Sequence, residues 1–306
     1  MKVGIVDIGS NTIRLVVYDV IDMTYKEILN QRSFAGLIEY VDDDRLSQTG
    51  MDKLVKTLSN IKELTYLVRC DKVFYFATAS LRGLSNSIDL LTYIKKELDI
   101  DIDIITGEEE AYFDYVSLKN SKITKTGLGI DLGGGSCQVF AFDGDDVEKS
   151  NSFRIGSLLL YKTFVSSLFP KEREKKAIKN YVLAELEKSP ELKKLGFTDI
   201  YAMGGTARAA IKLHRVLAGS SPKVKNNYAL TVEQIDEMID TIYDMGKDGI
   251  KLLCHVIPER VYTIIPGLIA IKAICQYTGA KGIVAIKSSV REGYLTEKVI
   301  KNKLFS

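Results

Sequence analysis

The chain has 306 residues, of which 46% are hydrophobic and 27% charged, and its formal net charge is +2. That length accommodates one large or two ordinary domains, and the near-neutral charge gives no general preference for nucleic acid. The four cysteines are scattered without a CxxC pair, which indicates reduced thiols rather than a zinc site or disulfide framework. The N-terminus lacks the pattern of a signal peptide, and no apolar run reaches the about 20 residues of a membrane span. We therefore expect a cytoplasmic protein with no membrane or nucleic-acid partner.

The chain begins with two β-rich runs over residues 3–20, joined by Gly9, Ser10 and Asn11. Small and flexible residues between two such runs predict a hairpin, and a third run over residues 25–29 extends it to a meander. Asp7 ends the first run. Glycine at a strand end lets backbone N–H groups approach a ligand without a Cβ in the way.

Strands and helices then alternate. Apolar residues at spacings of three and four predict a helix over residues 46–68, and a strand over 72–78 leads to Arg82. A helix follows from residue 87, and a short strand over 102–106 runs into a helix that opens with Glu108, Glu109 and Glu110. This alternation predicts an α/β fold.

The pattern of the N-terminus returns about one domain length later. An apolar run ends in Asp131 and is followed by Gly133, Gly134, Gly135 and Ser136, after which apolar alternation resumes. Two turns with the same pattern of strand, acid, glycine turn and strand predict a duplicated unit. The polar segment 121–126 directly precedes the second copy, so we place the domains at residues 1–121 and 122–306.

A third glycine turn lies farther along. A strand over residues 199–203 ends in Gly204, Gly205 and Thr206, and a helix over 207–217 begins directly after it. Strand-end turns and free helix N–H groups favour anions, so we expect phosphate at all three turns. None of them fits a P-loop or a dinucleotide-binding motif.

The three acids at 108–110 have two explanations. Carboxylates in the first turn of a helix are stabilised by its dipole, which accounts for any two of them. A catalytic interpretation needs one carboxylate that polarises a water molecule. Arg82 also has two explanations, because an arginine that follows a strand can be a surface residue or a phosphate ligand. His214 and His255 stand alone and give little support to histidine chemistry.

Taken together, the motifs resemble one known family, the exopolyphosphatase/guanosine pentaphosphate phosphohydrolase (Ppx/GppA) family of the actin and sugar-kinase superfamily. The matching segments cover essentially the whole chain, and they are Asp7-Ile-Gly-Ser-Asn-Thr-Ile-Arg14, Ala77-Thr-Ala-Ser-Leu-Arg82, Ile105-Thr-Gly-Glu-Glu-Glu-Ala111, Ile130-Asp-Leu-Gly-Gly-Gly-Ser136, Met203-Gly-Gly-Thr206 and Arg291-Glu-Gly293. The resemblance implies the short form of the family, with two ribonuclease-H-like domains and a phosphate-binding cleft between them.

The resemblance also implies residue roles. Glu110, directly before the alanine of its motif, would be the catalytic base, and Asp131 would assist with water or metal. Mg²⁺ or Mn²⁺ would be the cofactor, with Asp131 and Glu110 as its ligands. Arg82 would bind phosphate. The turns Gly9-Ser10-Asn11, Gly133-Gly134-Gly135-Ser136 and Gly204-Gly205-Thr206 would hold phosphoryl groups.

The implied reaction is exopolyphosphatase activity, the release of orthophosphate from the end of inorganic polyphosphate. Guanosine pentaphosphate presents the same terminal anhydride and stays an alternative substrate. A phosphotransferase and a non-catalytic sensor are weaker alternatives; the sensor rests on Tyr112 and Tyr262, which stand where the family usually has an arginine and an acid. The sequence leaves a homodimer open.

Overall fold

The computed structural model describes residues 1–121, 126–144, 146–223 and 227–302. It divides the chain into two compact units, one of Met1–Glu110 with Arg291–Ser306 and the other of Ala111–Val290. The division expected from the sequence, 1–121 and 122–306, differs from this in two places. The boundary falls inside a helix, and the C-terminal segment returns to the first unit. The polar segment 121–126, on which the expectation depended, lies almost entirely outside the described residues.

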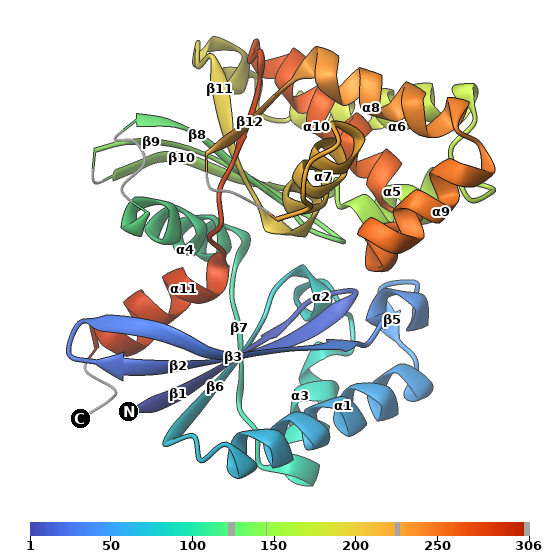
Figure 1. The fold of residues 1–306 in the computed structure, drawn as a ribbon. Helices are drawn as coiled ribbons and strands as arrows, with labels where there is room; N and C mark the ends of the chain where they lie inside the picture. Colours follow the sequence, from blue (N-terminus) through green and yellow to red (C-terminus); the bar gives the residue numbers. More distant parts are fainter. Residues whose placement is uncertain (122–125, 145, 224–226, 303–306) are drawn as a thin grey trace. The chain divides into compact units, whose positions relative to one another are not determined.

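The first unit contains a five-stranded mixed sheet in the order β3-β2-β1-β6-β7 (Figure 1). Three of its strands form the antiparallel meander expected from the sequence: β1 (Lys2–Ile8), β2 (Thr12–Ile21) and β3 (Thr24–Phe34). The other two run parallel to β1: β6 (Lys72–Ala77) and β7 (Ile102–Ile104). A small hairpin of β4 (Val41–Asp42) and β5 (Arg45–Leu46) completes the strands described in this unit. The α/β prediction is confirmed here.

The helices of the first unit follow the apolar spacing of the sequence. They are α1 (Gln48–Leu67), α2 (Ala79–Arg82), α3 (Ser87–Leu98) and α11 (Val290–Tyr294), which continues as a π-helical turn (Leu295–Ile300). The Ser47 side chain accepts a hydrogen bond from the Gly50 N–H and caps α1. The apolar stripe of α1, at Leu54, Leu58 and Ile61, is buried in the core of this unit.

The second unit repeats this arrangement. Its sheet has the order β10-β9-β8-β11-β13-β12. The strands β8 (Thr126–Leu132), β9 (Cys137–Asp143) and β10 (Asp146–Phe153) form an antiparallel meander, and β11 (Asp199–Met203) and β13 (Gly282–Ala285) run parallel to β8. Edge strand β12 (Tyr228–Thr231) is an addition without a counterpart in the first unit. The repeated order supports the duplication read from the two glycine turns.

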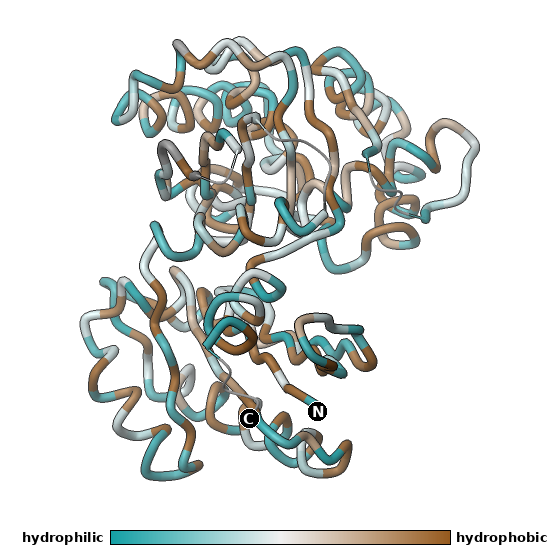
Figure 2. The backbone as a smooth tube through the Cα atoms, turned by 90° about the vertical axis from the view of Figure 1, so that its left-hand side faces the viewer, coloured by the Kyte–Doolittle hydropathy of each residue, from teal (hydrophilic) through white to brown (hydrophobic). Residues whose placement is uncertain are grey.

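The helical layer of the second unit surrounds one apolar helix, α10 (Ile264–Thr278), which is buried on nearly all sides. Its neighbours are α5 (Ser157–Phe164), α6 (Glu172–Leu186), α7 (Gly204–Leu217) and α8 (Val232–Asp244). A further helix, α9 (Lys247–Val256), packs against α7 and α8. Figure 2 shows how hydrophobic and hydrophilic stretches follow one another along the backbone.

Helix α4 (Gly107–Asn120) crosses the division, because the first unit ends at Glu110 and the second begins at Ala111. From Ala111 onward its apolar side chains pack against Phe140 and Phe142 of β9. The first turn of α4 follows β7 and is part of the first unit. No helix in the described ranges combines the length and apolarity that crossing a bilayer requires.

Candidate functional site

The first glycine turn joins β1 to β2, as expected from the sequence. The Gly9 N–H donates to the Thr12 carbonyl at 3.2 Å and closes the turn. The carbonyls of Ser10 and Asn11 accept hydrogen bonds from residues 35, 36 and 38, which fix the turn from one side. Within the described residues, neither the Ser10 N–H nor the Asn11 N–H donates a hydrogen bond. Two adjacent N–H groups of this kind can bind an anion.

The triple-glycine turn between β8 and β9 has the same construction. The Gly133 N–H donates to the Ser136 carbonyl at 2.9 Å. The N–H groups of Gly134 and Gly135 make no hydrogen bond to any residue that the structure describes. The turn therefore offers two backbone N–H groups from which phosphate oxygens can accept hydrogen bonds.

The N-terminus of helix α5 packs against this turn and donates hydrogen bonds to it. The Gly134 carbonyl accepts hydrogen bonds from the N–H groups of Leu158 and Leu159 at 2.9 and 3.0 Å. A Cβ on Gly156 would lie only 2.2 Å from the Gly134 carbonyl oxygen, so this position has no room for a side chain. The start of α5 and the triple-glycine turn are thus packed backbone against backbone, which leaves the turn little freedom to move.

The third glycine turn begins α7 and lies beside Asp131. Gly204 has φ +82°, and a Cβ there would lie 2.0 Å from Asp131 Oδ1. A Cβ on Gly205 would lie 1.9 Å from Arg260 Nη2, and Arg260 Nη1 donates to Thr206 Oγ1 at 3.3 Å. The second unit thus brings together the predicted Asp131, the predicted turn and a guanidinium. An anion at the first turn of α7 would meet both the helix N–H groups and Arg260.

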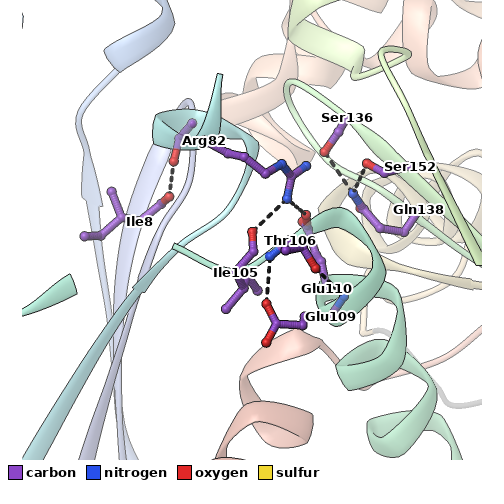
Figure 3. Close-up of polar contacts among 10 residues, drawn as sticks. Ile8, Arg82, Ile105, Thr106, Glu109, Glu110, Ser136, Gln138 and Ser152 are labelled. Atoms are coloured by element: carbon purple, nitrogen blue, oxygen red, sulfur yellow. Dashed lines mark hydrogen bonds and ion pairs between the residues drawn. The ribbon is translucent and has the colours of Figure 1, made fainter. Parts of the chain in front are cut away.

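A buried amide lies beside the triple-glycine turn. Gln138 is directly opposite Asp131 in the β8–β9 ladder, so both side chains are on one face of the sheet. Its Nε2 donates to Ser136 Oγ and to Ser152 Oγ, each at 3.1 Å (Figure 3). Because the Ser136 oxygen accepts from Gln138, its hydroxyl hydrogen remains available to another acceptor.

In the first unit the structure separates the three acids of α4. Glu109 forms a capping box with Thr106: Oε2 accepts from the Thr106 N–H at 2.9 Å, and the Glu109 N–H donates to Thr106 Oγ1 at 3.1 Å. The backbone hydrogen bond from Thr106, aided by Lys298, lowers the pKa of Glu109. Glu108 is exposed. Glu110 is 7% exposed and differs from both, so the helix-dipole explanation does not account for it.

Arg82 contacts Glu110. Its Nη1 donates to the Ile105 carbonyl at 2.9 Å and lies 3.3 Å from Glu110 Oε2 (Figure 3). The two side chains come from the end of α2 and the first turn of α4, two elements that follow neighbouring strands. The guanidinium is therefore not a free surface group, and it holds the carboxylate in one orientation.

Asp7 has a buried partner that the sequence did not indicate. Arg291 Nη1 donates to Asp7 Oδ2 at 2.6 Å, and both side chains are largely buried. Burial by itself lowers the pKa of Arg291, but Asp7 and Glu292 more than reverse this, and the guanidinium stays charged. The neighbouring Glu292 accepts from the Tyr18 hydroxyl at 2.8 Å. These contacts attach α11 to β1 and β2.

The residues available for a metal ion are few. Within the described ranges, no group of three His, Cys, Asp or Glu side chains could hold a metal. Mg²⁺ commonly binds through one or two carboxylates together with waters and substrate phosphates, so a complete protein cage is not needed. Asp131 fits this manner of binding, because Gly204 has no Cβ and so leaves room for the Asp131 carboxylate beside the third glycine turn.

The structure places every predicted site residue. The first unit contains Gly9, Ser10, Asn11, Arg82 and Glu110, and the second contains Asp131, Gly133, Gly134, Gly135, Ser136, Gly204, Gly205 and Thr206. Sequence reasoning did not find Arg260, Gln138 or Arg291 as neighbours of these residues. The position of Arg260 just before an apolar helix carried no sign of the long-range contact to Gly205.

Comparisons with known proteins agree on one family. The Ppx/GppA phosphatase family matches residues 16–302. Exopolyphosphatase 1 of Mycobacterium tuberculosis is 24% identical over 306 residues, which cover 98% of this chain and 88% of that protein. A guanosine-5'-triphosphate,3'-diphosphate pyrophosphatase of Aeromonas hydrophila is 25% identical over 294 residues, which cover 95% of this chain and 58% of that protein. The family expected from the motifs is confirmed.

Solved structures show the same fold. The Ppx/GppA family member of Aquifex aeolicus has a TM-score of 0.80 at 24% identity, and the match covers 99% of this chain and 98% of that one. An exopolyphosphatase from Cytophaga hutchinsonii has a TM-score of 0.83 at 20% identity, with 96% of each chain covered. The expected two-domain fold of the actin and sugar-kinase type is confirmed.

Proposed function

The chain belongs to the Ppx/GppA phosphatase family, and we propose that it is an exopolyphosphatase. As a member of this family it is a hydrolase that acts on phosphoric anhydrides. In the proposed reaction, water attacks the terminal phosphorus of inorganic polyphosphate. The bond between this phosphorus and the bridging oxygen breaks, and orthophosphate leaves.

The observation that supports hydrolysis is the environment of Glu110. It is the buried one of the three acids in the first turn of α4, and Arg82 lies 3.3 Å from its Oε2. A general base has to be held where it can accept a proton from the attacking water. We assign this role to Glu110, since Glu109 caps the helix and Glu108 is exposed.

Backbone N–H groups would bind the phosphoryl oxygens. In the first unit the proposed donors are the N–H groups of Ser10 and Asn11. In the second unit they are those of Gly134 and Gly135 and of the first turn of α7, whose N-cap Met203 makes no side-chain cap. Arg82 would bind phosphate through its remaining N–H groups. In phosphoryl transfer, positioning and stabilisation of negative charge supply most of the catalysis, so fixed N–H donors suit this reaction.

We propose Asp131 as a ligand for Mg²⁺ or Mn²⁺, supported by its place beside Gly204. Glu110 as a further ligand stays a prediction from the resemblance. When bound, such an ion would neutralise phosphate oxygens. The chain's own residues would orient the phosphate chain and accept the proton.

Two substrates fit a terminal anhydride. Polyphosphate is favoured by the extent of the matches, because the chain covers 88% of the exopolyphosphatase and 58% of the pyrophosphatase. Guanosine pentaphosphate is the second candidate, supported by the similarity to the latter.

Release of orthophosphate from polyphosphate, guanosine pentaphosphate and ATP, each with Mg²⁺ and with Mn²⁺, tests the proposal. We expect polyphosphate to give the highest kcat/KM. A higher kcat/KM for guanosine pentaphosphate would make that compound the substrate instead of polyphosphate. ATP turnover only in the presence of an added acceptor would indicate a phosphotransferase. Tight binding of polyphosphate with no phosphate release would indicate a sensor.

A further inference from the structure

The C-terminal residues 291–300, here called the closing segment, contact the elements that carry the predicted site residues of the first unit. Arg291 binds Asp7 at the end of β1. The ring of Tyr294 stacks on Phe76 of β6, with centroids 4.7 Å apart, and its hydroxyl donates to Asp103 of β7 at 3.2 Å. These strands lead into the Gly9 turn, Arg82 and α4 respectively.

Lys298 extends these contacts to the helix that carries Glu110. Its Nζ lies 3.3 Å from Glu109 Oε1 and 3.8 Å from Asp103 Oδ2. The other oxygen of Glu109 accepts from the Thr106 N–H. One carboxylate thus joins the backbone at the start of α4 to the closing segment.

We propose that Lys298 is a positioning residue for Glu110. By holding Glu109, it fixes the first turn of α4 and, through the backbone, the place of the adjacent Glu110 side chain. Lys298 forms ion pairs with Glu109 and Asp103. Its positioning role rests on the proposed function of Glu110 as the general base. Reaction rates fall steeply when a reacting group is displaced by about an ångström. A contact distant from the reacting atoms can therefore change kcat.

The size of the effect follows from the exposure of the pair. The side chains of Lys298 and Glu109 are 36% and 39% exposed, so solvent screens their attraction. We expect the loss of the pair to lower kcat about two- to five-fold while KM changes little.

Two variants remove the pair from opposite sides. Lys298→Met removes the ammonium group and keeps the aliphatic chain. Glu109→Gln removes the charge and keeps the capping box, since glutamine also serves at this position. Both should lower the kcat of polyphosphate hydrolysis by the same factor, and the double variant should be no slower than either. Lys298→Arg should restore most of the rate.

Lys301→Met is the matched control, because Lys301 pairs at 2.5 Å with Glu297 in the same part of the chain. It should leave kcat unchanged. Amide hydrogen exchange of the full chain, followed over residues 105–113, gives a second readout that needs no substrate. Exchange should accelerate in Lys298→Met and not in Lys301→Met.

The outcomes separate this inference from the proposed function. If the wild type releases no phosphate, the proposed function fails and the exchange result still decides whether Lys298 orders this turn. If the wild type is active but Lys298→Met keeps its kcat and its exchange, Lys298 is not a positioning residue. Strictly multiplicative losses in the double variant would likewise contradict the coupling.

Discussion

At the residue scale, the first turn of α4 shows what the sequence could and could not distinguish. Three consecutive glutamates predict a helix start equally well, and only the family motif pointed to Glu110. The structure gives a physical difference: Glu109 forms the cap, Glu108 is exposed, and Glu110 is buried beside Arg82. Such a difference depends on which way each side chain leaves the helix, and this becomes visible only with the tertiary neighbours in place.

Arg82 is predicted to act on both phosphate and Glu110. Arg82→Met removes a charged hydrogen-bond donor, so we expect kcat/KM for polyphosphate to fall by about ten-fold or more. Arg82→Lys should recover only part of this loss, because lysine lacks the planar fork. Arg45→Met, at an exposed arginine of the same unit, is the control. Unchanged kinetics in Arg82→Met would remove this residue from the site.

Residues outside recognisable motifs could not be predicted. Gln138 and Arg260 contact residues of two glycine turns, yet Gln138 lies inside a strand and Arg260 lies before an apolar helix. Tyr112 and Tyr262, which depart from the usual family pattern, are 40% and 53% exposed. The sequence marked these two positions by their difference from that pattern, and nothing in the structure explains the difference.

At the element scale, the three glycine turns were predictable because they combine strand ends with residues that tolerate close approach. The structure adds that each turn is held by particular neighbours. For the triple-glycine turn, that neighbour is the start of α5, where Gly156 packs against the Gly134 carbonyl. Because this contact joins residues that are distant in the sequence, the packing role of Gly156 could not be predicted.

Gly156→Ala tests this packing. The new Cβ would lie 2.2 Å from backbone oxygen, which cannot move as a side chain can, so we expect a loss of about 1–3 kcal/mol in the free energy of unfolding. Gly83→Ala is the control, because its added Cβ meets no atom within 4 Å beyond its two chain neighbours, and its φ is −93°. Urea unfolding measures both. Equal stability of Gly156→Ala and wild type would contradict the tight packing.

The capping box of α4 predicts a pH dependence. The pKa of Glu109 is lowered in the folded state by the Thr106 N–H, so its stabilisation is present above the ordinary value of 4.5 and is lost as the pH falls through the folded value. Glu109→Gln should therefore be less stable than wild type at neutral pH, with the difference shrinking below pH 4.5. Urea unfolding across this range measures it, with Glu108→Gln as the exposed control. A difference that does not change with pH would contradict the assignment.

At the scale of the whole molecule, the duplication was predictable and the path of the C-terminus was not. The two sheets share their strand order, as the repeated turns suggested. Residues 291–306 nevertheless belong to the first unit. Apolar periodicity predicts that a helix forms there, but not which unit it joins, because that choice depends on contacts such as Arg291 with Asp7 across most of the chain.

Arg291→Met tests whether the C-terminus is an integral part of the first unit. The substitution leaves the mostly buried Asp7 carboxylate without its guanidinium, and breaking a buried pair in this way costs about 3–5 kcal/mol of unfolding free energy. Lys301→Met, which affects an exposed pair, should stay within about 0.5 kcal/mol of wild type. A loss below about 1 kcal/mol in Arg291→Met would show that this pair contributes little.

The central claim, that Glu110 is the base of a polyphosphate hydrolase, is tested most directly by Glu110→Gln. The substitution keeps the shape of the side chain and removes its ability to accept the proton. We predict that orthophosphate release falls by at least about a hundred-fold, the usual contribution of a general base, while polyphosphate binding stays within a few-fold of wild type. Turnover within a few-fold of wild type would contradict the claim.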